Sequence, residues 1–285
     1  MLNADFLNEI SQTLDVPITS HQPLSGGDIN EVYIVESETE KWVIKVNHAQ
    51  RFPGMFKKEA LGLDALRKPE IIDVPQVTEH GQFQNQSYLL LEYRAPGTKN
   101  TDFWSIFGRQ LAKLHRQSAP QFGFAENNYI GSLPQYNSSE ENAADFYINQ
   151  RLQPQFELAL KNGYKFTKID SFYDKIRPII PQEKPALIHG DLWGGNYLVN
   201  IEGYPCLIDP ATAFAPREMD IAMMHLFGGF DTAIFKAYNA EFPLAEGWQN
   251  RIKLWQLYYV LVHVNLFGGG YYASANAIID QYTGS

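Results

Sequence analysis

The pattern of apolar residues changes at RAPG, residues 94–97, and this change constrains the fold more than any other feature of the sequence. Upstream, the spacing predicts strands at 31–35, 41–46, 74–83 and 87–93 and helices at 2–15 and 56–68. Downstream, it predicts helices at 103–117, 141–163, 171–180 and from about 219 onward, with two short strands around 197–208. We therefore predict an α+β fold with two lobes, a strand-rich one of residues 1–93 and a larger, mainly helical one of residues 94–285.

Composition limits the classes of function. The chain has 285 residues, 45% of them hydrophobic, which is enough for one large or two modest cores. Its net charge of -9 argues against a general binder of nucleic acids or anionic membranes, because no basic surplus exists to neutralise phosphates. A single cysteine suits the reducing cytoplasm, and the start of the chain lacks the features of a signal peptide. We expect a cytoplasmic protein without nucleic-acid or membrane partners, and the oligomeric state stays open.

The stretch LIHGDLWGGN, residues 187–196, places an imidazole, a carboxylate and an amide together behind an apolar run. His189, Asp191 and Asn196 have the spacing of the catalytic loop of kinases, although a polar turn can show this spacing by chance. The following residues indicate a hairpin, which brings its ends together, so that Asn196 and Asp209 are candidate ligands for a Mg²⁺ ion on nucleotide phosphates. Asp191 is the candidate catalytic base, because it can orient a substrate hydroxyl and accept its proton.

Lys45 lies in WVIKV, within a run of β-branched residues, where a buried ammonium needs a paired charge. The next predicted helix offers Glu59, and a Lys–Glu pair of this kind holds nucleotide phosphates in kinases. The alternative is a lysine on an edge strand and a solvated glutamate. Gly26 and Gly27 precede a strand and could bring backbone amides close to ATP phosphates, although a plain turn explains them equally well.

The strand that ends at the pattern change, SYLLLEY, occupies the place of the hinge in a two-lobed kinase. The backbone groups of Leu91, Glu92 and Tyr93 are therefore candidates to hydrogen-bond the adenine of ATP. An ordinary transition from strand to linker needs no function, and the order of the parts along the chain favours the hinge.

Six longer stretches carry a more specific signal. They are HGDLWGGN, IDPATAF, REMDIAMMHLFGGF, FGFAENNYIGSLPQYN, RLQPQFELA and LYYVLVHVNLFGGGYY. These stretches resemble the fructosamine (ketosamine) kinase family, within the superfamily of protein-kinase-like and aminoglycoside phosphotransferase-like proteins. The resemblance covers nearly the whole chain, and the form of the loop with Trp193 is more specific than the spacing of His, Asp and Asn alone.

The resemblance implies a bilobal protein-kinase-like fold and an enzyme that uses ATP and Mg²⁺ to phosphorylate the 3-hydroxyl of ketosamines, which are sugar adducts of amines. The 3-phosphate is unstable, so such enzymes are regarded as acting in deglycation. By motif position, the resemblance assigns Asp191 as base, Asn196 and Asp209 as metal ligands, and Lys45 and Glu59 as the pair that anchors the phosphates. It also implies that Trp193 faces the sugar, with packing in the core as the alternative reading.

The sequence departs from the family in its glycine-rich loop. Many members carry cysteine there, and Asp28 occupies the position here, so redox control through that loop is not expected. The sole cysteine, Cys206, is predicted to be a small core residue. Asp209 is followed by Pro210, which argues against a mobile activation segment.

Other polar residues are predicted to support the site. His189 is expected to hydrogen-bond the backbone near the hairpin, and Asp220 either to cap its helix or to bond the backbone of the loop. His115, His225 and His263 have no partner at metal spacing, so no zinc site is expected.

Two rival functions remain open at this stage: a kinase of another small molecule, such as an aminoglycoside or choline, and a kinase-shaped binding module without activity. The sequence does not decide among fructose-, ribulose- and erythrulose-derived ketosamines. Nor does it decide whether the ketosamine is free or attached to a protein lysine.

Overall fold

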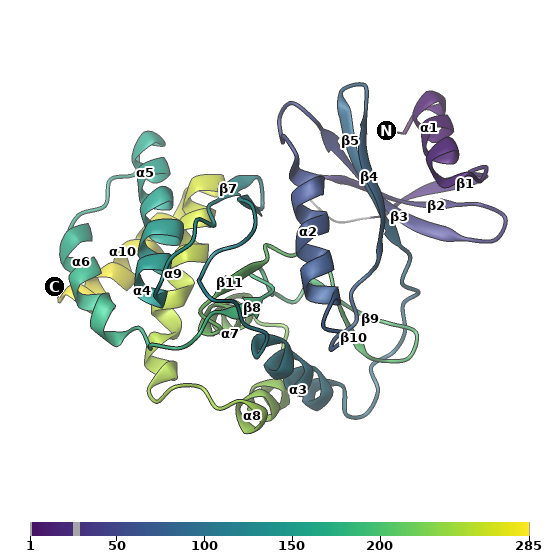
Figure 1. Cartoon of the computed structure of the whole chain (residues 1–285). Coiled ribbons are helices and arrows are strands. Elements are labelled where there is room, and N and C mark those ends of the chain that lie inside the picture. Colours follow the sequence, from purple (N-terminus) through teal and green to yellow (C-terminus); the bar gives the residue numbers. More distant parts are fainter. Residues whose placement is uncertain (1, 25–28, 285) are drawn as a thin grey trace.

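The small lobe is built around a five-stranded antiparallel sheet in the computed structural model, which describes residues 2–24 and 29–284 (Figure 1). In spatial order the strands are β1 (Ser20–Leu24), β2 (Glu31–Glu36), β3 (Lys41–His48), β5 (Gln86–Glu92) and β4 (Val77–Phe83). Helix α1 (Ala4–Leu14) covers one face of the sheet, and α2 (Met55–Arg67) covers the other. The central strand β3 carries Lys45.

Side chains alternate along β3, and this alternation connects the strand to both helices. Ile44 packs in one apolar cluster with Phe6 of α1. Val43 lies on the opposite face and packs against the cluster that includes the apolar side of α2. Lys45 shares that face and reaches Glu59 of α2. The lysine is therefore fixed between a strand and a helix, rather than exposed on the edge of the sheet.

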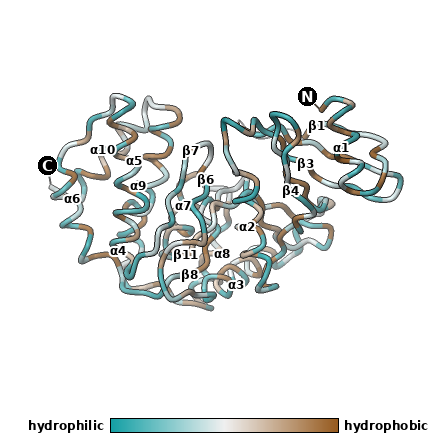
Figure 2. The backbone as a smooth tube through the Cα atoms, turned by 45° about the horizontal axis from the view of Figure 1, so that its top comes forward, coloured by the Kyte–Doolittle hydropathy of each residue, from teal (hydrophilic) through white to brown (hydrophobic). Residues whose placement is uncertain are grey.

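The large lobe is organised around α9 (Trp248–Phe267), whose residues 254–262 are buried without a break. A helix that is buried on all sides is the centre of a domain core. Packed against it are α5 (Gln153–Lys161), α7 (Glu218–Phe227) and α10 (Gly270–Thr283). The other helices are α3 (Phe103–His115), α4 (Ala143–Asp145), α6 (Ile169–Ile176) and α8 (Thr232–Glu241), with a π-helical segment Phe146–Leu152 and a 3₁₀ turn Arg177–Ile179. Figure 2 shows apolar residues along these helices and hydrophilic residues in many of the connecting loops.

Three short antiparallel strand pairs position the loops of the large lobe. They are β6 (Asn128–Ile130) with β7 (Leu133–Gln135), β8 (Ala186–Ile188) with β11 (Ala213–Ala215), and β9 (Tyr197–Val199) with β10 (Pro205–Leu207). Ile188 ends β8 opposite Ala213, which begins β11, so the loop after β8 and the segment before β11 leave the pair side by side. The hairpin β9–β10 confirms the one predicted around 197–208, and Cys206 within it is fully buried, as predicted.

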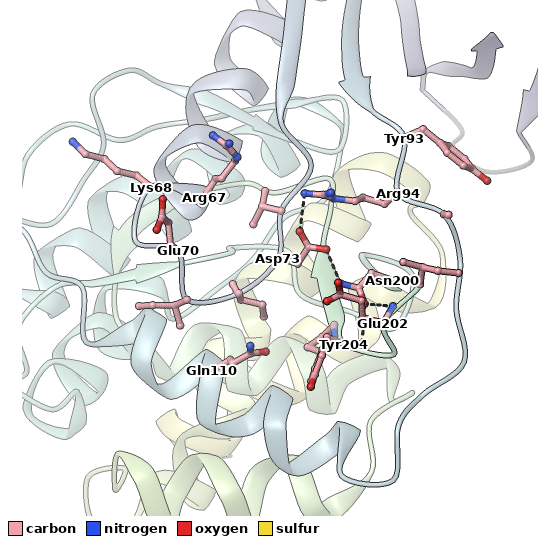
Figure 3. A pocket seen from close by; sticks show the side chains of 16 residues that line it. Arg67, Lys68, Glu70, Asp73, Tyr93, Arg94, Gln110, Asn200, Glu202 and Tyr204 are labelled. Carbon is pink, nitrogen blue, oxygen red and sulfur yellow. Dashed lines mark hydrogen bonds and ion pairs between the residues drawn. The ribbon is translucent and has the colours of Figure 1, made fainter. Parts of the chain in front are cut away.

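The linker that follows β5 is fixed to the turn of this hairpin. Arg94 bridges Glu92 at 2.7 Å and Asp73 at 3.0 Å, and the side-chain amide of Asn200 donates to Asp73 at 2.9 Å. A Cβ atom at Gly97 would lie 2.1 Å from the carbonyl oxygen of Asn200, so only glycine fits there. Figure 3 shows Arg94, Asp73 and Asn200 of this network among the residues that line a cavity of about 620 Å³.

The predicted α+β fold with a strand-rich and a helical lobe is confirmed, and the predicted long strands and helices are present. Within the predicted helix 141–163, however, residues 146–152 are π-helical. Strand β1 and the short strands β6, β7, β8 and β11 were not predicted. Among residues 2–24 and 29–284, no helix is long and apolar enough to cross a membrane.

Candidate active site

Lys45 is 5% exposed, and its ammonium is paired with two carboxylates. Its Nζ lies 2.6 Å from Oε1 of Glu59 in α2 and 2.6 Å from Oδ1 of Asp209, just after β10. Burial alone would lower the pKa of Lys45, but the carboxylates of Asp209 and Glu59 outweigh it and hold this pKa above its usual range. The predicted paired charge is therefore present, and the alternative of a solvated lysine and glutamate is wrong.

The two carboxylates beside Lys45 have different surroundings. The side chain of Glu59 is 11% exposed, and burial raises its pKa, although the Lys45 ammonium acts in the opposite direction. The side chain of Asp209 is 44% exposed. Glu59 is therefore a buried anchor for the lysine, whereas Asp209 is open to a ligand.

The ends of the hairpin β9–β10 meet, as predicted. The side-chain Nδ2 of Asn196 lies 3.4 Å from the carbonyl oxygen of Asp209 and donates to the carbonyl oxygen of Asp191 at 2.8 Å. Among the described residues, the hydrogen bonds of the Asn196 side chain are all made by Nδ2, so Oδ1 takes part in none of them. Asp209 has a left-handed backbone, with φ of 55°.

The donor set at this point fits a Mg²⁺ ion. Asn196 and Asp209 line one cavity and offer an amide oxygen and a carboxylate. Mg²⁺ prefers oxygen ligands and is commonly bound through one or two protein carboxylates together with substrate phosphates and waters. No cluster of three or more His, Cys, Asp or Glu suited to a metal ion occurs in the described parts of the chain.

Asp191 borders two adjoining cavities. One, of about 210 Å³, is lined by Lys45, Glu59, Asn196 and Asp209. The other, of about 560 Å³, is lined by Trp193, by Ile29, Arg51 and Phe52 of the small lobe, and by mainly apolar residues of the large lobe. Burial, with a smaller contribution from the charge of Asp209, raises the pKa of Asp191 to about 7.

Trp193 lines both cavities and is 42% exposed. The alternative that it packs in the core is therefore wrong.

Hydrogen bonds of Asp220 and His189 hold the loop that carries Asp191, in the way predicted for these two residues. The buried carboxylate of Asp220 accepts the backbone N–H groups of His189 and Gly190, both at 2.8 Å. The ring Nε2 of His189 lies 2.8 Å from the carbonyl oxygen of Ile208 and donates to it. Of the two readings of Asp220, the one in which it bonds the backbone of the loop is correct.

A buried amide network, which the sequence did not reveal, holds the segment after Asp209. Asn128 donates to the carbonyl oxygen of Thr212 at 2.9 Å, and Gln135 donates to that of Ala211 at 2.9 Å. The side chains of Asn137, Arg151 and Tyr258 complete this network. The five residues whose side chains form the network lie in FGFAENNYIGSLPQYN, RLQPQFELA and LYYVLVHVNLFGGGYY. Only the resemblance of those stretches to a known family could have drawn attention to them.

The predicted hinge residues lie at the end of β5. Leu91 pairs with strands on both sides, and the N–H of Glu92 donates to the carbonyl oxygen of Gln76 at 2.9 Å. The amide of Glu92 is therefore not available to adenine. Tyr93 follows the last residue of the strand. Gly26 and Gly27 lie outside the described residues.

Known proteins resemble this chain over nearly its whole length. The family model described as fructosamine kinase matches residues 3–284. A relative from Synechocystis sp., named a probable ketoamine kinase, is 39% identical over 278 residues, which are 96% of this chain and 94% of that protein. Another protein of that name, from Enterococcus faecium, is 36% identical over 266 residues, which are 91% of this chain and 94% of that protein.

Solved structures extend the similarity. A candidate fructosamine-3-kinase from Thermobifida fusca matches with a TM-score of 0.88 and 30% identity over 100% of both chains. An aminoglycoside phosphotransferase solved with ADP and hygromycin B has a TM-score of 0.64 at 15% identity, covering 99% of this chain and 100% of that one, and therefore shares the fold alone. The fold and its relatives define a kinase-like phosphotransferase. With the family model matched from residue 3 to 284, the chain belongs to the fructosamine kinase family.

Proposed function

We propose that the protein is an ATP-dependent ketosamine 3-kinase, which transfers the γ-phosphoryl group of ATP to the 3-hydroxyl of a sugar adduct on an amine. The observation that carries this proposal is the position of Asp191 at the border of two cavities. One cavity has the cation and the oxygen ligands suited to phosphates, and the other has the apolar walls suited to an organic acceptor. Family membership and the names of the relatives support a ketosamine as that acceptor.

Each residue has a task that its surroundings support. Lys45, held in place by Glu59, binds phosphate oxygens. Asp191 accepts a hydrogen bond from the sugar hydroxyl, orients it toward the phosphate and holds its proton after transfer. Trp193 offers its exposed indole to the apolar side of the sugar.

A Mg²⁺ ion held by Asn196 and Asp209 would neutralise charge on the phosphates. The adenine is proposed to lie at the end of β5 beside Tyr93, because Leu91 pairs with strands on both sides and the amide of Glu92 is bonded to Gln76.

The product accounts for a role in deglycation. A phosphate on carbon 3 lies two carbons from carbon 1, and the carbonyl at carbon 2 makes the hydrogens of carbon 1 acidic. Loss of a proton from carbon 1, followed by breakage of the bond between carbon 3 and oxygen, releases inorganic phosphate. The nitrogen lone pair forms a C=N bond to carbon 1 as the phosphate leaves, and hydrolysis of this imine then frees the amine.

Replacement of the base tests the assignment. Asp191→Asn is expected to lower ketosamine phosphorylation about 10²- to 10⁴-fold, the range for a positioned base, and to leave ATP affinity nearly unchanged. Steady-state kinetics and ATP titration of both proteins measure the two quantities. A variant with more than about a tenth of the wild-type turnover contradicts the role of Asp191.

An acceptor panel tests the substrate class. It contains ketosamines of fructose, ribulose and erythrulose, an aminoglycoside and choline. We expect turnover with at least one ketosamine. Turnover of choline or the aminoglycoside alone would replace this proposal with the corresponding rival kinase, and absence of turnover with every acceptor would favour a binding module.

A further inference from the structure

The charge distribution in the larger cavity points to a feature of the acceptor. Among the described residues that line it, Asp191 is the one carboxylate and Arg51 the one permanently charged cation. His263 also lines this cavity, but burial lowers its pKa, so the imidazole is neutral at neutral pH. Exposed aromatic rings of the large lobe, those of Phe227 and Phe267, form another part of the wall.

Arg51 belongs to the turn between β3 and α2, so it faces this cavity from the small lobe. Its guanidinium carbon lies 5.1 Å from the centre of the ring of Phe52, which is 6% exposed, so a buried ring supports the guanidinium. The Arg51 side chain has no ion pair with any carboxylate of the described residues. By contrast, Lys57 in the adjoining helix is already paired with Glu126 at 2.8 Å. A guanidinium without a carboxylate partner can bind a carboxylate through two parallel hydrogen bonds.

This arrangement distinguishes two kinds of ketosamine by their chemistry. When the sugar is attached to the α-amino group of an amino acid, a carboxylate lies two bonds from the nitrogen. When it is attached to a lysine side chain of a protein, the nitrogen carries only an aliphatic chain. The cavity offers the protonated nitrogen no carboxylate besides Asp191 among the described lining residues, so a substrate that carries its own carboxylate fits better.

We propose that the preferred acceptor is a free ketosamine formed on the α-amino group of an apolar amino acid, with its carboxylate bound by Arg51 and its side chain placed against Phe227 and Phe267. This inference rests on the proposed ketosamine kinase activity and specifies its substrate. Arg51 is then a residue that determines specificity, outside the groups that act on the phosphate.

A pair of substrates that differ by one carboxylate tests the proposal. They are the fructose adduct of valine and the fructose adduct of isobutylamine, which is valine without its carboxylate. For the wild-type protein we expect kcat/KM to be about tenfold or more higher for the valine adduct, as for loss of a charge-assisted hydrogen bond. Arg51→Gln is expected to remove this preference, while kcat/KM for the isobutylamine adduct and KM for ATP stay unchanged.

Lys57→Gln is the matched control, because it removes one positive charge nearby without altering the lining of the cavity. This variant is expected to keep the preference for the valine adduct. Loss of the preference in both variants would indicate a general effect of net charge and would overturn the role of Arg51.

Two further outcomes would overturn the inference alone. One is equal kcat/KM for the two adducts in the wild-type protein. The other is a higher kcat/KM for the adduct on the side chain of lysine blocked at both its α-amino and carboxyl groups. If fructose adducts are not turned over, the same three amines are tested with the sugar that the acceptor panel selects. Absence of turnover with every ketosamine of that panel would instead contradict the proposed function, and the inference would fall with it.

Discussion

Two neighbouring buried tyrosines of α9 differ in whether their hydroxyl groups have a hydrogen-bond partner. Tyr258 and Tyr259 are each 1% exposed. The hydroxyl of Tyr258 donates to Oε1 of Gln135 at 2.8 Å, whereas the hydroxyl of Tyr259 has no hydrogen-bond partner among the described residues. A buried polar atom costs free energy when it lacks a partner, so the two hydroxyls should affect stability in different ways.

Tyr258→Phe is expected to lower the free energy of unfolding by about 1–3 kcal/mol, because it leaves the buried oxygen of Gln135 without its donor. Tyr259→Phe is expected to leave this free energy unchanged or to raise it slightly, because it removes an atom that has no partner. Urea unfolding of both variants and the wild-type protein measures the difference. The reverse order would show that the Tyr259 hydroxyl is well paired in the folded protein.

At the residue scale, the sequence revealed groups whose chemical type is unusual for their position. Lys45 within an apolar strand required a counter-charge, and Asn196 and Asp209 stood at the two ends of a hairpin. The buried amides of Asn128 and Gln135 were different, because a polar residue in a short strand looks like an ordinary surface residue. Their burial depends on the packing of segments far apart in the chain, such as β7 against the segment after Asp209, and no local pattern encodes that packing.

At the scale of elements, the pair β6–β7 connects the core of the large lobe to the segment after Asp209. Gln135, the last residue of β7, is 2% exposed and donates to the carbonyl oxygen of Ala211. Asn128, the first residue of β6, donates to that of Thr212. These two bonds hold the backbone directly beyond a proposed metal ligand, and such supporting contacts orient ligands in metal sites.

Gln135→Met removes this support while keeping a side chain of similar length. We expect the Mg²⁺ concentration for half-maximal ATP affinity to rise about tenfold or more, because metal affinity depends on supporting contacts of this kind. Calorimetric titration of ATP at a series of Mg²⁺ concentrations measures this shift. Gln150→Met is the control, because Gln150 bonds Glu140 and the N–H of Ser138 rather than the segment after Asp209. A loss of thermal stability in Gln135→Met without a shift in Mg²⁺ dependence would show a structural role only.

Whether the sequence predicted an element depended on the length of that element. The long strands and helices have enough residues for a periodic pattern, and they were found. Strands β8 and β11 have three residues each and cannot show alternation, so the antiparallel pair that places the loop of Asp191 beside the segment of Asp209 was missed. The π-helical segment was also missed, because its spacing differs little from that of an α-helix over two turns.

At the scale of the whole molecule, the hairpin β9–β10 contacts the small lobe and the linker at two places, its turn and the ends of its strands. At its turn, Asn200 is connected through Asp73 to Arg94 of the linker. At its ends, Asp209 is paired with Lys45 of the small lobe. We propose that the boundary between the lobes lies between residues 93 and 94, directly before this linker.

Because Asp209 contacts the small lobe and ends the hairpin of the large lobe, its removal should affect nucleotide binding more than removal of Asn196. We expect ATP affinity of Asp209→Ala to become nearly independent of Mg²⁺, since the charged ligand is lost. Asn196→Ala keeps the carboxylate and is expected to raise the half-maximal Mg²⁺ concentration only about tenfold. Lys45 keeps its contact with Glu59 in both variants, so the small lobe should remain folded. Titration of ATP at several Mg²⁺ concentrations measures the order, and equal Mg²⁺ dependence in Asp209→Ala and the wild-type protein would exclude Asp209 as a metal ligand.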